Sequence, residues 1–177
     1  MAASLFLLLA VILAFTAGTG PWIIVATVVL ATAAGTRLPD LDAPLRLGHR
    51  SALLHSILPF LVALLDPRTG AVAAGLAFGI GLHLAANLFP RTMRGFATIK
   101  LPLWGSIGVF PSYLWIATHA AANIVGGFVV LERIAARQVA ASALAGVGVL
   151  GTAYLMRTDG GWGAMALMLL IGWLILR

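Results

Sequence analysis

Hydrophobic residues occur along this chain in long unbroken runs, separated by short stretches rich in Pro, Gly or charged residues. The runs lack the alternation of apolar and polar positions that is typical of membrane β-strands. In lipid a segment must satisfy its own backbone hydrogen bonds, so the pattern predicts helices. Seven apolar segments are expected: Ser4–Ala17, Trp22–Thr36, Ser51–Asp66, Ala71–Phe89, Ser112–Leu131, Val139–Met156 and Gly163–Leu176.

The composition assigns these helices to a membrane. Hydrophobic residues make up 62% of the 177 residues and charged residues only 9%, whereas about a quarter of a soluble domain is charged. We therefore predict an all-α polytopic integral membrane helix bundle. The first two segments are shorter than the roughly 20 residues of a full span, so six or seven transmembrane helices remain open. No long polar linker divides the chain, which favours a single transmembrane domain over 1–177.

The formal net charge is +6, but the basic residues are spread thinly between the apolar segments. This spacing favours topological anchors and argues against nucleic acid as a partner. If all seven segments cross, one side holds Arg37, Arg46, Arg50, Arg91, Arg94, Lys100 and Arg157, and the other holds Arg68, Arg133, Arg137 and Arg177. The excess predicts that the first side and the N-terminus face the cytoplasm.

Polar side chains beside or within apolar helices are costly in lipid and therefore indicate function. They are Asp40, Asp42, His49, His55, His83, Asn87, His119 and Asn123. Because successive helices alternate in direction, the aspartates and histidines are expected in one layer near one membrane face. His83/Asn87 and His119/Asn123 are each four residues apart and share a helix face. Nearby glycines favour close helix packing, so the two asparagines are alternatively part of a packing seam.

Imidazole and carboxylate groups together suggest two kinds of chemistry. They are the ligands of Zn²⁺, Mn²⁺ or Fe²⁺, and carboxylate with water suits Mg²⁺. A bound divalent metal would activate water, whereas without metal His55 and Asp42 would form a proton-transfer pair. The candidate catalytic residues are Asp40, Asp42 and His55. The candidate metal ligands are Asp40, Asp42, His49, His55, His83, Asn87 and His119.

Three motifs in order carry a family resemblance: Leu38–Asp42, then Gly48–Ser56, then Gly79–His83 followed by Asn87. Over roughly residues 30–105 the chain resembles the LexA-binding inner-membrane-associated family of metal-dependent hydrolases. The resemblance implies a bacterial inner-membrane location. It also implies that the site contains Asp40, Asp42, His49, His55 and His83, with Asn87 at the position of a family aspartate. His119 has no counterpart in the family pattern.

The departures from the family pattern keep two functions open. Ser51 stands for a glycine, Leu54 for a threonine, and His49 and His55 are six residues apart where the family has five. The shared layer favours a membrane-embedded metal-dependent hydrolase of a lipid or lipid-linked phosphoester. The departures and the small residues favour a non-catalytic scaffold or accessory subunit of a larger membrane complex. A proton or ion carrier is less favoured, because no acidic residue lies at mid-membrane.

The expected partners are membrane lipid and, for a scaffold, other membrane proteins. Arg91, Arg94 and Lys100 lie on the side of the His/Asp layer, with Trp104 nearby. Such a group would hold a phosphate-bearing lipid headgroup over the site. Ordinary topological anchoring is the alternative explanation.

Overall fold

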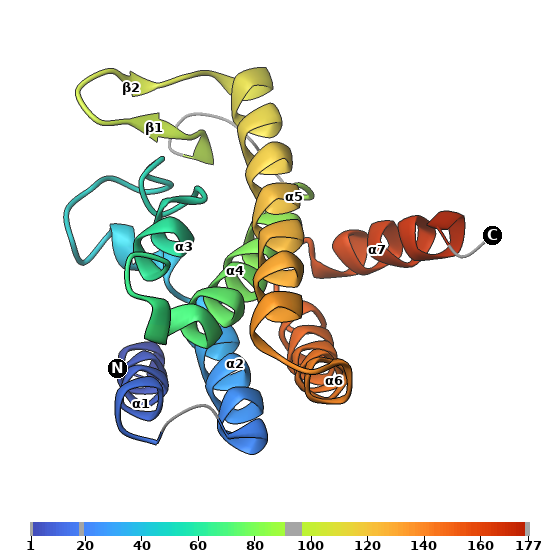
Figure 1. The fold of residues 1–177 in the computed structure, drawn as a ribbon. Helices are drawn as coiled ribbons and strands as arrows, with labels where there is room; N and C mark the ends of the chain where they lie inside the picture. The colour runs from blue at the N-terminus through green and yellow to red at the C-terminus, as the bar shows by residue number, and fades with distance from the viewer. Residues whose placement is uncertain (1, 18–19, 91–96, 176–177) are drawn as a thin grey trace.

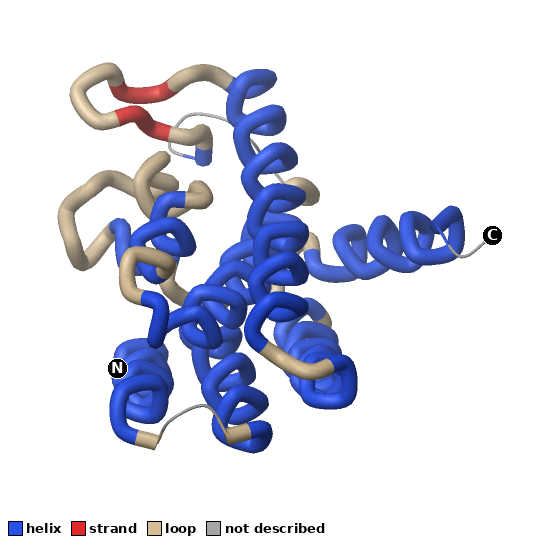
Figure 2. The backbone as a smooth tube through the Cα atoms, in the orientation of Figure 1, coloured by secondary structure: helices blue, strands red, loops and turns tan. Residues whose placement is uncertain are grey.

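The computed structural model describes residues 2–17, 20–90 and 97–175, most of them helical (Figure 1 and Figure 2). The α-helices are α1 (Ala2–Thr16), α2 (Pro21–Gly35), α3 (Leu58–Ala63), α4 (Gly70–Ala86), α5 (Val109–Ile134), α6 (Arg137–Leu155) and α7 (Gly161–Ile175). Two short 3-10 helices are η1 (Pro39–Asp42) and η2 (Pro67–Thr69), and a small hairpin joins β1 (Lys100–Leu101) to β2 (Gly105–Ser106). The predicted helical class is thus confirmed. Of the basic residues counted above, Arg91, Arg94 and Arg177 lie outside the described residues.

α4 is the central helix, and nearly all of its residues are buried. α2 and α5 pack along it, and α3, α6 and α7 contact it as well. Glycines allow α2 to approach closely. A Cβ added to Gly75 would lie 2.3 Å from the Val28 carbonyl oxygen, and one added to Gly79 would lie 2.2 Å from the Thr32 carbonyl oxygen. The close helix contact predicted from the glycine spacing is therefore present.

Three stretches are long and apolar enough to cross a membrane: Pro67–Ala86, Val109–Ile134 and Arg137–Leu155. The most apolar window of the first is 89% buried inside the protein, but those of the other two are each only 28% buried. α5 and α6 therefore turn broad apolar faces outwards, with exposed side chains such as Leu114, Val125 and Val149. α1, α2 and α7 are shorter apolar helices. α7 extends away from the other helices (Figure 1).

The predicted helix over Ser51–Asp66 is wrong for most of its length, because α3 has only six residues. The chain before α3 instead forms hydrogen bonds with β1. The Ala52 N–H donates to the Lys100 carbonyl at 2.9 Å, and the Lys100 N–H donates to the Arg50 carbonyl at 3.0 Å. These tertiary bonds replace helical ones, and residues 51–57 form turns and bends in which Ser51, Ala52, His55 and Ser56 are buried. A helix of six residues is too short to span a bilayer by itself.

The hairpin β1–β2 was not expected from the sequence. Its strands pair antiparallel, with Lys100 opposite Ser106. Leu103 and Gly105 have positive φ angles of 71° and 76°, which close the tight turn between the strands. Because β1 also bonds to residues 50 and 52, the hairpin fixes the loop that leads into α3.

Candidate functional site

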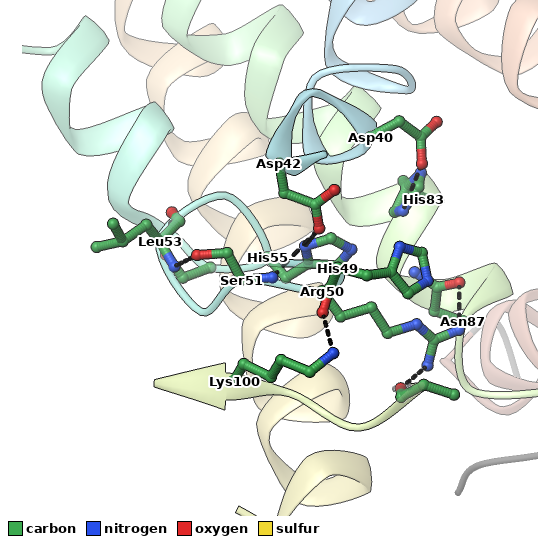
Figure 3. A network of polar contacts seen from close by, with 12 residues as sticks. Asp40, Asp42, His49, Arg50, Ser51, Leu53, His55, His83, Asn87 and Lys100 are labelled. Atoms are coloured by element: carbon green, nitrogen blue, oxygen red, sulfur yellow. Dashed lines mark hydrogen bonds and ion pairs between the residues drawn. The ribbon is translucent and has the colours of Figure 1, made fainter. Parts of the chain in front are cut away.

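The acidic and imidazole side chains meet where several helix ends converge (Figure 3). After α2 the chain turns into η1, whose first residue, Pro39, favours the start of a helix. A 3-10 helix has three residues per turn, so Asp40 and Asp42 project in different directions. Asp42 is 1% exposed and points towards His55 in the loop before α3. The Asp40 side chain is 57% exposed and points towards His83 near the end of α4.

Asp42 and His55 form a buried inner pair. Asp42 Oδ2 accepts a hydrogen bond from the Ser51 N–H at 3.2 Å and lies 3.9 Å from His55 Nδ1. That second distance is too long for a hydrogen bond. The buried His55 Nδ1 has no hydrogen-bond partner among the described residues. On the other side, the Trp115 indole N–H donates to the His55 carbonyl at 2.8 Å and ties the loop to α5.

The inner pair contacts the second histidine. The His55 and His83 rings meet edge to face, with centroids 5.4 Å apart and planes at 71°. The inner pair is therefore a buried imidazole beside a buried carboxylate, in direct contact with His83.

Asp40 and His83 form the outer pair. His83 Nε2 lies 3.9 Å from Asp40 Oδ1. His83 Nδ1 lies 3.1 Å from the Thr36 carbonyl oxygen and 3.1 Å from the Tyr154 hydroxyl. A carbonyl oxygen only accepts, so Nδ1 carries the proton in that bond. The Nε2 atom of the neutral His83 ring is then a proton acceptor that faces a carboxylate.

Arg50 links the loop to the end of α4. It is only 9% exposed and adopts a positive φ of 58°, unusual for a residue with a side chain. Its guanidinium donates from Nη1 to the Ala97 carbonyl at 2.8 Å and from Nη2 to Asn87 Oδ1 at 3.2 Å. Burial lowers the pKa of Arg50, although an arginine remains charged near neutral pH. From the sequence, Arg50 was expected only to be one of the charges that set the topology. Its position directly after His49 could have indicated that it belongs to the site.

Two of the predicted site residues make other contacts. The His49 side chain is exposed, and its carbonyl accepts a hydrogen bond from the Lys100 ammonium at 2.9 Å. The His119 ring stacks on Trp115 with centroids 4.3 Å apart, and its Nδ1 lies 2.9 Å from the Trp115 carbonyl oxygen. His119 therefore contacts its own helix. Asp40, Asp42, His55 and His83 are the predicted residues that the structure gathers into pairs.

The two asparagines lie against protein, as predicted. Asn123 is fully buried, and its amide nitrogen donates to the Ser56 carbonyl at 3.3 Å and to the His119 carbonyl at 2.8 Å. Asn87 is half-buried and accepts the hydrogen bond from Arg50. Asn87 thus provides a neutral oxygen for a cation where the family resemblance implies an acidic residue.

The placement of these groups does not support the expected metal centre. Among the described residues, no group of three or more His, Cys, Asp or Glu side chains is arranged to hold a metal ion. The imidazoles and carboxylates instead stand in two pairs, and a zinc site usually needs at least three protein ligands. Ligation of one divalent metal stays a prediction for Asp40, Asp42, His49, His55, His83, Asn87 and His119.

A cavity of about 820 Å³ opens beside the outer pair. Its polar wall contains Arg37, Asp40, His83, Tyr154 and Arg157, which come from the C-terminal ends of α2, α4 and α6 and the turns that follow. The inner pair does not line it, so a ligand in the cavity meets His83 and Asp40 first. Sequence reasoning missed Tyr154, whose hydroxyl near the end of an apolar helix was the available signal.

Comparisons of the chain with protein-family models, with curated proteins and with solved structures found no match. The function is therefore inferred from the side chains that line the cavity and from the order of the motifs that carry them.

Proposed function

We propose that this protein is a membrane-embedded hydrolase that acts on a lipid or a lipid-linked phosphoester. One observation carries the proposal: the His83–Asp40 pair lies in the wall of a large cavity at the ends of apolar helices. Hydrolysis needs a base that activates water within reach of the substrate. A lipid substrate also needs a site next to the apolar part of the membrane.

The outer pair has the geometry to activate a water molecule. The 3.9 Å between His83 Nε2 and Asp40 Oδ1 is too long for a direct hydrogen bond, but it suits one water that donates a hydrogen to each atom. In the proposed reaction this water attacks phosphorus while its proton passes to Nε2. The bond from phosphorus to the ester oxygen breaks, and the proton held by the imidazolium returns to the leaving oxygen. The products are an alcohol and a phosphate.

The inner pair supports the outer one. His55 contacts the His83 ring, and Asp42 holds the loop that carries His55 through the Ser51 N–H. Because neither side chain of the inner pair lines the cavity, both act as positioning residues in this proposal.

We further propose six or seven membrane crossings, with the N-terminus in the cytoplasm and the protein in a bacterial inner membrane. The support for alternating directions is that the two ends of α4 contact different elements. Just before the first residue of α4, the Arg68 guanidinium lies 4.2 Å from the centre of the Phe15 ring at the end of α1. Near the other end of α4, His83 lines the cavity. Residues 51–57, although irregular, are largely buried in protein, which is where irregular backbone is tolerated at membrane depth.

The motif order supports a relationship to the LexA-binding inner-membrane-associated hydrolases, which we also propose. The side chains that the three motifs have in common with that family include both aspartates and the two histidines of the paired site. The inner-membrane location rests on this resemblance.

A non-catalytic scaffold or accessory subunit of a larger membrane complex is the second candidate. The Arg50–Asn87 bond favours it. The neutral Asn87 amide accepts a hydrogen bond from the Arg50 guanidinium, which is a structural role, and it adds no anionic ligand for a metal. The close α2–α4 packing through glycines serves a scaffold equally well.

The test is turnover by the purified protein, reconstituted in vesicles with a panel of lipid phosphomonoesters and phosphodiesters. Wild type is expected to release phosphate or alcohol from at least one substrate. His83→Gln and Asp40→Asn are each expected to lower the rate by about 100-fold or more, the usual contribution of a general base. Asp66→Asn, which alters a carboxylate at the start of η2 that does not line this cavity, is the matched control with an unchanged rate. A wild type without turnover, or a His83→Gln variant as active as wild type, would contradict the proposal.

Chelation separates the two possible chemistries at this site. A mechanism that uses only His83 and Asp40 is expected to keep its rate in EDTA. Loss of activity that Zn²⁺, Mn²⁺ or Mg²⁺ restores would instead establish the metal dependence expected from the sequence. Elemental analysis of the purified protein gives the metal content independently of activity.

A further inference from the structure

The strongest feature that the proposed reaction leaves unused is a pair of arginines in the cavity wall. Arg37 follows the C-terminal end of α2, and Arg157 follows that of α6. Both side chains are exposed, and neither forms an ion pair among the described residues. A cation near a helix C-terminus is favoured by the helix dipole, which explains each arginine singly. It does not explain why two helices direct their cations to the same cavity.

We infer that Arg37 and Arg157 bind the phosphate of an anionic amphiphile in this cavity. The two threonine hydroxyls of the wall already donate within the protein. The Thr36 hydroxyl donates to the Ala33 carbonyl at 2.9 Å, and the Thr158 hydroxyl donates to the Tyr154 carbonyl at 2.8 Å. The two guanidinium groups are the charged donors left for a ligand, and a guanidinium matches the paired oxygens of a phosphate.

The charge balance of the wall also favours an anion. Two arginines stand against one carboxylate, Asp40, and that carboxylate faces His83. The cavity is thus net positive at neutral pH. A neutral or cationic headgroup would leave the two guanidinium groups without a counter-charge.

The apolar residues of the cavity indicate a hydrocarbon chain joined to the phosphate. Ala33 lies one helical turn before Arg37, and Leu150 lies about 10 Å before Arg157 at roughly 1.5 Å per residue. On both helices the polar positions stand at the end and the apolar positions stand further inside. Phe6 of α1 lines the same cavity. A ligand with a charged head and an apolar tail fits this order, with its head at the helix ends.

As a statement about the substrate of the site, this inference rests on the proposed function. The headgroup site expected from the sequence at Arg91, Arg94, Lys100 and Trp104 stays a separate prediction, because its first two residues lie outside the described part of the chain. The Lys100 ammonium is bonded to the His49 carbonyl.

The test is calorimetric titration of the full chain in neutral detergent with short-chain phosphatidic acid. Inorganic phosphate and the matching diacylglycerol are titrated in parallel. Phosphatidic acid is expected to bind the most tightly. Arg37→Gln and Arg157→Gln are each expected to weaken that binding by about tenfold, since each removes charge-assisted hydrogen bonds. Arg137→Gln, at the opposite end of α6, is the matched control with unchanged affinity.

Each outcome has a definite meaning. Unchanged binding in both arginine variants would overturn the inference, as would diacylglycerol binding as tightly as phosphatidic acid. Inorganic phosphate binding as tightly as the lipid would overturn the inference that the ligand is an amphiphile and would indicate a site for free phosphate. Arginine-dependent lipid binding without turnover would uphold the inference and contradict the hydrolase. Turnover with a KM that is unchanged in the arginine variants would uphold the hydrolase and contradict the arginine site.

Discussion

Arg50 and Asn87, 37 residues apart in the chain, are joined by a hydrogen bond of 3.2 Å from the guanidinium to the amide oxygen. The bond connects the loop before α3 to the end of α4, where His83 lies one turn earlier. Arg50 is nearly buried, so its positive charge must be stabilised by the oxygens that accept its hydrogen bonds. Asn87 is thus part of the framework that holds the two His/Asp pairs together.

Asn87→Leu should destabilise the fold while leaving the protein in the membrane. The change removes the acceptor of a buried guanidinium hydrogen bond, which typically costs about 1–3 kcal/mol. Asn87→Asp keeps an acceptor and adds a negative charge opposite Arg50, so it should retain most of the stability. Thermal unfolding of both variants in detergent is the measurement. A leucine variant as stable as wild type would show that the Arg50–Asn87 bond contributes nothing to the fold.

The glycines of α4 give a prediction about packing. Gly79→Ala places a Cβ about 2.2 Å from the Thr32 carbonyl oxygen, so α2 and α4 must separate. The expected cost is about 1–3 kcal/mol, the usual range for overpacking. Gly148→Ala is the matched control, because an added Cβ there meets nothing within 4 Å. That helix-interior change should stabilise by roughly 0.5–1 kcal/mol. Equal unfolding temperatures for the two variants would contradict the close α2–α4 contact.

The paired site was predictable from the sequence because its members sit near helix ends at matching depths. Asp40, Asp42, His55 and His83 follow from the apolar pattern and the alternation of helix direction, and the structure brings them together. The depth of a residue in the membrane, however, does not fix the direction in which its side chain points around the helix axis. His119 has the same depth as His83 by residue count, yet its ring stacks on Trp115 of its own helix.

Other features depend on contacts that no local pattern encodes. Residues 51–57 resemble the start of an apolar helix, but the Ala52 N–H bonds to Lys100, which is distant in the chain, and the Ser51 N–H bonds to the Asp42 side chain. The same is true of the hairpin that contains Lys100. The cavity likewise needs the ends of α2 and α6 to meet, so Arg37 and Arg157 look like separate topological charges until the helices are packed.

The two aspartates should separate stability from activity. Asp42 is buried and accepts from the Ser51 N–H. Burial lowers the pKa of Arg50, and the nearby Asp42 carboxylate opposes part of that effect. Asp42→Asn removes the negative charge beside the buried Arg50 guanidinium, and the free energy of unfolding is expected to fall by about 1–3 kcal/mol.

Asp40 has a mostly exposed side chain, so Asp40→Asn should change the free energy of unfolding by no more than about 0.5 kcal/mol. Its effect should instead appear in turnover, because Asp40 shares the cavity wall with His83. Thermal unfolding and lipid phosphoester hydrolysis, measured on both variants, give the four values needed. If Asp40→Asn destabilised the protein more than Asp42→Asn and left turnover intact, the assignment of a structural inner pair and a reactive outer pair would be reversed.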